Sequence, residues 1–272
     1  MSKEWDVEVL LPIAPHSPYL KETLLSLLNQ SYTNYKLLAV IDADDVANEM
    51  ILKRLVPSEI LKLIIVEPDF NLSRRLNAGI RASSAKFLAR ADADDVYHID
   101  RLKIQRHFML NIDPDCSVVG TNASVINEHS EVLFQLRTPV GADAVNNKML
   151  WRNPMLHPSI FGHREIFEEF NYREEMHISQ DYDLWLRIAT KYKLSNIPEE
   201  LLFYRVHSLN ASRRRISWKE IVQIHKSRRA FAKSRDISFL WCFSATLIWS
   251  FKNIALPPLF FLKLKIGMKG SK

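Results

Sequence analysis

The hydrophobic positions of this chain fall into short, largely apolar runs that alternate with stretches of helical spacing. Four runs of strand length lie in the N-terminal third, at 7–13, 37–41, 61–66 and 86–91. Runs of this kind are typical of inner strands of a parallel sheet, because both of their faces are buried. Segments with helical spacing lie between them, around 20–28, 48–55 and 71–81. This alternation predicts an α/β fold with a right-handed, doubly wound sheet.

The rest of the chain has a less regular pattern. We expect further elements in this order: a helix at 101–110, a strand at 117–126, an amphipathic helix at 180–192 and a closing strand at 201–205. Residues 151–158, which include Asn153 and His157, indicate a structured loop. We find no internal repeat and no low-complexity linker. Residues 1–212 are therefore expected to form one domain, followed by a helical tail at 213–272.

The net positive charge of the chain comes from its tail. The formal net charge is +6 at pH 7, yet residues 213–272 alone hold 14 lysines and arginines against 2 acidic residues. Apolar residues recur at helical spacing within 213–235, and 237–251 is uncharged. This run is shorter than the roughly 20 apolar residues that cross a bilayer. The combination favours peripheral contact of 213–265 with anionic lipid; the alternative is a helical hairpin packed on the domain or on a second subunit.

Cysteine usage and the N-terminus indicate the compartment. Cys116 and Cys242 lie far apart and show no metal-ligand spacing, which fits a reducing environment. The N-terminus is charged and shows no signal peptide before the first strand, so a cytoplasmic location is expected. We expect no nucleic-acid partner, and the sequence leaves the oligomeric state open.

Two acidic clusters follow strands of the predicted sheet. One occupies 42–45 after the second strand, and the other comprises Asp92, Asp94 and Asp95 after the fourth. Ligands of open α/β sheets bind beyond the carboxyl ends of strands. Carboxylates at this spacing suit a hard ion such as Mg²⁺ or Mn²⁺ that also holds a phosphate. The alternative is a solvated turn that caps the next helix, and the position at two strand ends favours the metal site.

Five segments occur in a consistent order, at 27–32, 71–80, 87–95, 179–187 and 204–207. Together they resemble the motifs of the inverting family-2 glycosyltransferases, and the resemblance covers roughly residues 5–212. It implies the GT-A fold, a Rossmann-like and mostly parallel central sheet flanked by helices. It also implies a hexosyltransferase that uses a nucleotide-sugar donor.

The resemblance also implies roles for particular residues. Asp94 and His207 are expected to ligate Mn²⁺ or Mg²⁺, and His207 is expected near the leaving diphosphate. The residues expected to bind the donor are Pro12, Ile13, Asp42, Arg74, Arg90, Asp92 and Asp95. Asp42 would accept a hydrogen bond from the nucleobase, and Arg75 is a further candidate for pairing with the diphosphate or the acidic cluster. Asp181 is expected to be the base that takes the proton from the acceptor hydroxyl, although by position alone it is a first-turn helix carboxylate.

The sequence departs from the family pattern at three places. Ala14 and Pro15 follow the first strand where a Tyr-Asn pair is common. The cluster after the second strand reads Ile-Asp-Ala-Asp-Asp where Asp-Asp-Gly-Ser is common, and Gln180 stands where Glu is frequent. We expect transfer from a UDP-sugar to a cell-surface glycan or lipid-linked acceptor, at the inner face of the plasma membrane. The alternatives are a nucleotidyltransferase, which normally has a basic, Gly-rich loop that is missing here, and a non-catalytic transferase scaffold.

Overall fold

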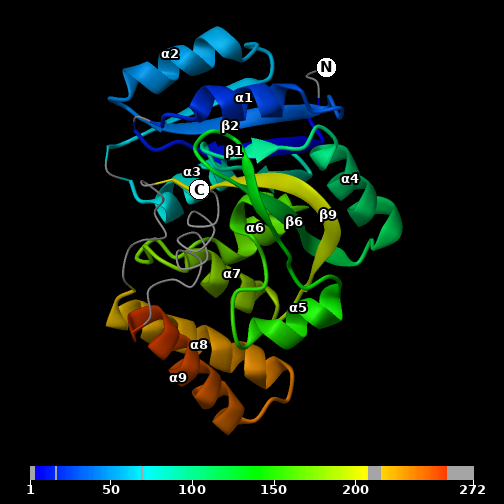
Figure 1. Cartoon of the computed structure of the whole chain (residues 1–272), viewed down its shortest axis with the longest axis vertical. Coiled ribbons are helices and arrows are strands. Elements are labelled where there is room, and N and C mark those ends of the chain that lie inside the picture. Colours follow the sequence, from blue (N-terminus) through cyan, green and yellow to red (C-terminus); the bar gives the residue numbers. More distant parts are fainter. Residues whose placement is uncertain (1–3, 16, 69, 208–215, 256–272) are drawn as a thin grey trace, which may run out of the picture.

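A computed structural model of the chain describes residues 4–15, 17–68, 70–207 and 216–255 (Figure 1). The first part alternates strands and helices as expected: β1 (Val7–Pro12), α1 (Leu20–Leu28), β2 (Tyr35–Asp42), α2 (Val46–Leu55), β3 (Leu61–Val66), α3 (Leu72–Ala82) and β4 (Phe87–Arg90). The middle part contains β5 (Val96–Tyr97), α4 (Arg101–His107), a π-helical turn (Phe108–Ile112), β6 (Cys116–Ile126), β7 (Val132–Leu136) and α5 (Ala142–Met149). The last part contains a 3₁₀ turn (His157–Ser159), β8 (Phe161–His163), α6 (Arg164–Phe170), α7 (Gln180–Ile188), β9 (Lys193–Arg205), α8 (Trp218–Ser234) and α9 (Phe239–Ala255).

The strands form one mixed sheet. Their order is β3-β2-β1-β4-β8-β6-β9-β5, and β7 pairs with β6. The part β3-β2-β1-β4 is parallel, β8 runs antiparallel to both of its neighbours, and β9 runs parallel to β6. This is the flanked α/β sheet that the GT-A resemblance implies. Because β1, β2 and β4 are parallel, the loops that follow them meet at one edge of the sheet.

Helices cover both faces of the sheet (Figure 1). Val7, Val9 and Leu11 of β1 pack with the apolar sides of α1, α2 and α4, whereas Leu10 packs with those of α3, α6 and α7. Burial on both faces explains why β1 is a nearly continuous apolar run rather than an alternating one.

Glu8 is the exception within β1, and it positions the next strand of the site. Its carboxylate is 1% exposed and accepts hydrogen bonds from the backbone N–H groups of Ser84, at 2.8 Å, and Ala85, at 3.1 Å. The hydroxyl of Ser83 also donates to it. A buried carboxylate needs such donors, and these three lie in the turn from α3 to β4. The hydrogen bonds to Glu8 therefore fix where β4 begins.

The sequence pattern missed several short elements. β5, β7, β8, α5 and α6 were not expected, and β9 begins at Lys193 rather than at residue 201. β8 has three residues, which is too short for a period to be recognised. In β9 the segment Pro198, Glu199 and Glu200 interrupts the apolar pattern, at the point where its pairing with β6 shifts register.

The basic segment and the uncharged segment of the tail form α8 and α9, which lie outside α7 as an additional layer (Figure 1). α8 begins with a capping box between Ser217 and Glu220. Glu220 also accepts from the backbone N–H groups of His177, at 2.8 Å, and Ile178, at 2.9 Å, which ties α8 to the segment before α7. The inner sides of α8 and α9 therefore pack on the domain, which agrees with the alternative of a helical hairpin packed on the domain.

Two predictions for the tail fall on residues that the structure does not describe. The predicted boundary between the domain and the tail, at 212/213, lies within 208–215. The last part of the predicted lipid-contact segment, residues 256–265, also lies outside the described ranges. Among the residues that the structure describes, no helix has the length and apolar content needed to cross a membrane.

Asp183 is the main polar link between α7 and α8. Its side chain is fully buried and accepts from Arg173, at 2.7 Å, and from Arg187, at 2.8 Å. The hydroxyl of Ser227 in α8 donates to the same carboxylate at 2.6 Å. Asp183 therefore has a structural role.

We predict that Asp183→Asn lowers the free energy of unfolding by about 3 kcal/mol, because two arginines lose a buried counter-charge. Urea denaturation of the purified protein measures the effect. Asp181→Asn is the matched control in the same helix: Asp181 forms no ion pair within the described residues, so a change below about 1 kcal/mol is expected. Equal losses for the two variants would contradict this role of Asp183.

Candidate active site

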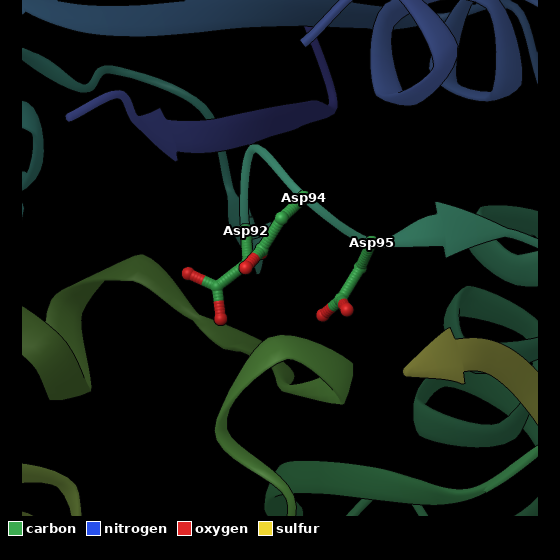
Figure 2. Close-up of side chains that lie close together, drawn as sticks. All are labelled: Asp92, Asp94 and Asp95. Carbon is green, nitrogen blue, oxygen red and sulfur yellow. The ribbon is translucent and has the colours of Figure 1, made fainter. Parts of the chain in front are cut away.

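Three carboxylates converge in the loop between β4 and β5, which we call the acidic loop (residues 91–95). One carboxylate oxygen from each of Asp92, Asp94 and Asp95 lies within 4.8 Å of the other two. Figure 2 shows the three side chains pointing away from the loop on the same side. Asp95 is buried, whereas Asp92 and Asp94 are partly exposed. Three acidic groups that repel each other are thus held at the carboxyl end of β4.

Burial and mutual repulsion act on the protonation of this cluster. Burial raises the pKa of Asp95 well above its ordinary range, and the charges of Asp94 and Asp92 raise it further. Burial also raises the pKa of Asp92, against the opposing charge of Arg90. The side chains of Arg90 and Asp92 form an ion pair that is almost closed to solvent on the arginine side. More positive charge at this point would stabilise the ionised cluster.

The donor set fits a hard divalent cation. All three ligand candidates are carboxylates, and Oδ2 of Asp95 is buried without a hydrogen-bond partner among the described residues. Mg²⁺ and Mn²⁺ prefer such oxygen ligands. His207 lies at the same place: its Nε2 is 2.9 Å from Oδ2 of Asp94, and its ring packs against Tyr19. The structure therefore brings together the two residues expected at the metal.

Arg205, the last residue of β9, closes the acidic loop. Its backbone N–H donates to Oδ1 of Asp95 at 2.8 Å, and its Nε donates to the backbone carbonyl of Asp94 at 2.8 Å. The guanidinium is fully buried and also pairs with Glu22 of α1 at 2.6 Å. The sequence analysis gave Arg205 no role, although it lies within the matched segment 204–207. Its contacts show that it holds the loop in shape.

A second part of the site lies at the ends of β1 and β2. Asp42 is buried and its Oδ2 accepts from Arg75 at 2.7 Å. Arg75 also donates to the backbone carbonyl of Ile13 at 2.8 Å, so the residue after Pro12 and β1 is tied to the end of β2. Oδ1 of Asp42 is buried without a hydrogen-bond partner among the described residues. One acceptor atom therefore remains for a ligand.

The structure places the two neighbouring arginines of α3 differently. Arg75 is buried at the site, whereas the side chain of Arg74 is half exposed and lies 3.6 Å from Glu174. The spacing of the apolar residues in α3 distinguishes the two arginines. Leu72, Leu76 and Ile80 define the apolar side of α3, and Arg75 lies on that side at spacing i+3 from Leu72.

Asp181 lies in the first turn of α7. Its Oδ2 accepts from the side-chain amide of Asn153 at 2.6 Å. Burial raises the pKa of Asp181, and the hydrogen bond from Asn153 and the charge of Arg90 act in the opposite direction. The same arginine is paired with Asp92 of the acidic loop.

Tyr172 and His157 complete the surroundings of Arg90. The hydroxyl of Tyr172 and Nε2 of His157 are 2.7 Å apart. Burial raises the pKa of Tyr172 and lowers that of His157 well below its ordinary range, so the imidazole is neutral at neutral pH. The sequence analysis did not single out Tyr172, because it follows α6 in an irregular segment without a recognisable period. His157 has a hydrogen-bonded, structural position, which is the common role of a lone buried histidine.

Comparisons with known proteins give the family. The family described as "Glycosyl transferase family 2" matches residues 9–170. The O-antigen biosynthesis glycosyltransferase WbnJ of Escherichia coli is 28% identical over 244 residues, which cover 87% of this chain and 93% of WbnJ. These matches decide against a nucleotidyltransferase and support a transferase enzyme.

Solved structures share the fold. S. aureus TarS 1-349 in complex with UDP-GlcNAc superimposes with a TM-score of 0.68 at 15% identity, covering 96% of this chain and 76% of that one. The mannosyltransferase PcManGT of Pyrobaculum calidifontis, in complex with GDP-Man and Mn²⁺, gives a TM-score of 0.62 at 17% identity, covering 98% and 75%. The acidic loop at the end of β4, the mixed GT-A sheet and the match over 9–170 lead to one conclusion: this chain belongs to glycosyl transferase family 2 and is a glycosyltransferase.

Proposed function

We propose that the protein transfers a sugar, with inversion, from a nucleotide-sugar donor to a hydroxyl group of a cell-surface glycan or lipid-linked acceptor. The observation that carries the proposal is the convergence of Asp92, Asp94 and Asp95 at the carboxyl end of β4. His207 lies beside Asp94 in this cluster, and Arg90 pairs with Asp92. Burial raises the pKa of Asp181, and the charge of Arg90 opposes that rise, which supports a base near the same site.

Asp181 is the proposed base. In an inverting displacement, the acceptor oxygen forms a bond to the anomeric carbon while the bond from that carbon to the diphosphate breaks. Asp181 would take the proton of the acceptor hydroxyl, and the pair of electrons would leave with the diphosphate. Asn153 would orient the carboxylate through its hydrogen bond to Oδ2.

The acidic loop is the proposed place of the diphosphate. Asp92, Asp94 and Asp95, with His207 beside Asp94, would hold Mn²⁺ or Mg²⁺. The cation would supply positive charge to the leaving diphosphate. Arg90 adds a cationic group at the same place, where Nε and Nη1 are buried without hydrogen-bond partners among the described residues. These two atoms are available to donate to the donor substrate.

Asp42, Ile13 and Pro12 are the proposed contacts of the nucleobase. Arg75 holds Asp42 by Oδ2, so the free Oδ1 faces a fixed direction and can accept from an imide N–H such as that of uracil. We therefore favour a UDP-sugar, the class of donor with which TarS forms its UDP-GlcNAc complex. Arg74 would act from the rim, since its side chain is half exposed.

Similarity supports a proposal for the acceptor and the place of action. WbnJ is named for O-antigen biosynthesis, and we propose an acceptor of that class, a cell-surface glycan or its lipid-linked intermediate. We propose that this protein acts at the inner face of the plasma membrane, as a peripheral protein whose catalytic domain comprises residues 1–212.

We predict that Asp94→Asn lowers the rate of metal-dependent UDP-sugar hydrolysis about 100-fold or more, because a charged ligand is lost. The assay measures UDP release by purified protein with Mn²⁺, across a panel of nucleotide sugars. Asp44→Asn makes the same change in the exposed acidic turn after β2 and should leave the rate unchanged. Hydrolysis at the wild-type rate by Asp94→Asn would contradict the proposed metal site.

We predict that Asn153→Leu moves the acidic limb of the pH profile of kcat/KM to higher pH. The hydrogen bond from Asn153 lowers the pKa of Asp181, so its loss raises that pKa, and the base becomes protonated at higher pH. The charged and titratable groups that act with Asp181 are Arg90 and Tyr172. Because Asp181 is ionised well above its pKa, the rate at the alkaline plateau should change less than the rate on the acidic limb.

The companion variant Asp181→Asn separates a base from a structural residue. It should lower the rate of transfer about 100-fold or more while leaving the affinity for UDP unchanged, because general-base catalysis contributes about that factor. An unshifted acidic limb in Asn153→Leu, together with full activity of Asp181→Asn, would show that the base lies elsewhere.

A further inference from the structure

The outward side of α9 is apolar apart from Ser244 over its described side chains. Cys242, Ala245 and Trp249 point inward and are buried. The side chains on the outward side are large, apolar and between 45% and 74% exposed: Phe239, Leu240, Trp241, Phe243, Leu247, Ile248 and Phe251. We call these seven residues the α9 face. A helix that is apolar on all sides normally has a covering partner on each of them.

A row of basic side chains lies on the exposed side of α8. It consists of Lys219, Lys226, Arg229 and Lys233, all four of which are exposed. The guanidinium of Arg229 lies 5.3 Å from the centre of the Phe239 ring, so the basic row and the α9 face adjoin directly. Apolar side chains beside exposed lysines and arginines are the arrangement of helices that lie in a membrane surface.

We propose that the α9 face docks on the surface of a bilayer that contains anionic lipid, with the basic row of α8 against the headgroups. The charge pattern favours lipid over a second copy of this chain. A two-fold pairing through the α9 face would bring two basic rows close together, whereas an anionic surface complements them. Since no helix among the described residues is suited to span the membrane, α9 lies in the interface rather than across it.

The α9 face adjoins the acceptor side of the site. The ring of Trp241 packs edge-on against Trp151, with 5.7 Å between the ring centres. Trp151 lies two residues before Asn153, which binds the candidate base Asp181. Docking through α9 would therefore bring the loop beside Asp181 to the membrane surface, where a lipid-linked hydroxyl is presented. This consequence rests on the proposed function, whereas the docking itself does not.

Vesicle binding by the full chain tests the docking. The protein is sedimented with vesicles of phosphatidylcholine containing about one quarter phosphatidylglycerol, and with vesicles of phosphatidylcholine alone. We expect stronger binding to the anionic vesicles. Leu240→Ser should weaken binding to them about ten-fold, because an apolar side chain that is 74% exposed no longer enters the interface. Lys233→Ala should weaken it about five-fold on anionic vesicles only.

The control removes an apolar side chain at the other end of the molecule. Met50 is 66% exposed and belongs to α2, which lies at the opposite end of the molecule from α9 (Figure 1), so Met50→Ser should leave vesicle binding unchanged. Circular dichroism and the UDP-sugar hydrolysis assay check that each variant is folded, since Leu240, Lys233 and Met50 lie outside the proposed site.

Two results would overturn the docking. One is the same weak binding to both kinds of vesicle, unaffected by Leu240→Ser. The other is that the wild-type protein forms a dimer in sedimentation velocity, that Leu240→Ser converts the dimer to a monomer, and that the wild-type protein does not bind vesicles. The α9 face would then be the interface with a second copy of the chain. Vesicle binding with no hydrolysis of any nucleotide sugar would instead count against the proposed function alone.

Discussion

The repulsion among three carboxylates in the acidic loop is the constraint on which the candidate site depends. Such a cluster at the end of a buried strand is unfavourable unless cations and hydrogen-bond donors offset it. Arg90 pairs with Asp92, and the backbone N–H of Arg205 donates to Asp95. Even so, the pKa of Asp95 stays well above its ordinary range. The protein thus holds an arrangement that additional positive charge would stabilise, which is a property suited to binding a cation.

The sheet brings the partners of the acidic loop together from distant parts of the sequence. Parallel pairing of β1 with β2 and β4 places Ile13, Asp42 and the acidic loop at one edge. Arg75 joins the first two of these, and Arg205 joins the acidic loop to α1 and β9. Arginine suits both positions, because its planar guanidinium donates several hydrogen bonds in fixed directions at once. Each part of the site is therefore held by one buried arginine that contacts several elements.

The sequence pattern left packing on the domain and contact with a membrane surface as alternatives for the tail, and the two helices of the tail have a side suited to each. The inner side of α8 packs on α7, where Asp183 and Ser227 form a polar link within the apolar contact. The outer side of α9 carries large apolar residues that nothing covers within the described structure. Packing on the domain and contact with another surface are thus compatible, because they use opposite sides of the same two helices.

The sequence by itself determined the alternation of strands and helices in the N-terminal part, the two acidic strand ends, the family resemblance and the uneven charge of the tail. These are local properties, since burial on both faces, helical spacing and charge are all visible within a few residues. The short strands β5, β7 and β8 and the register shift in β9 depend on pairing with β6 or β9, so the sequence pattern did not predict them. Only the tertiary structure decided that Arg75 contacts Asp42, that Arg205 closes the acidic loop, and that Asn153 contacts Asp181. The physical reason is that these contacts join residues between 28 and 111 positions apart, and their partners are set by the packing of the sheet and its helices rather than by neighbouring residues.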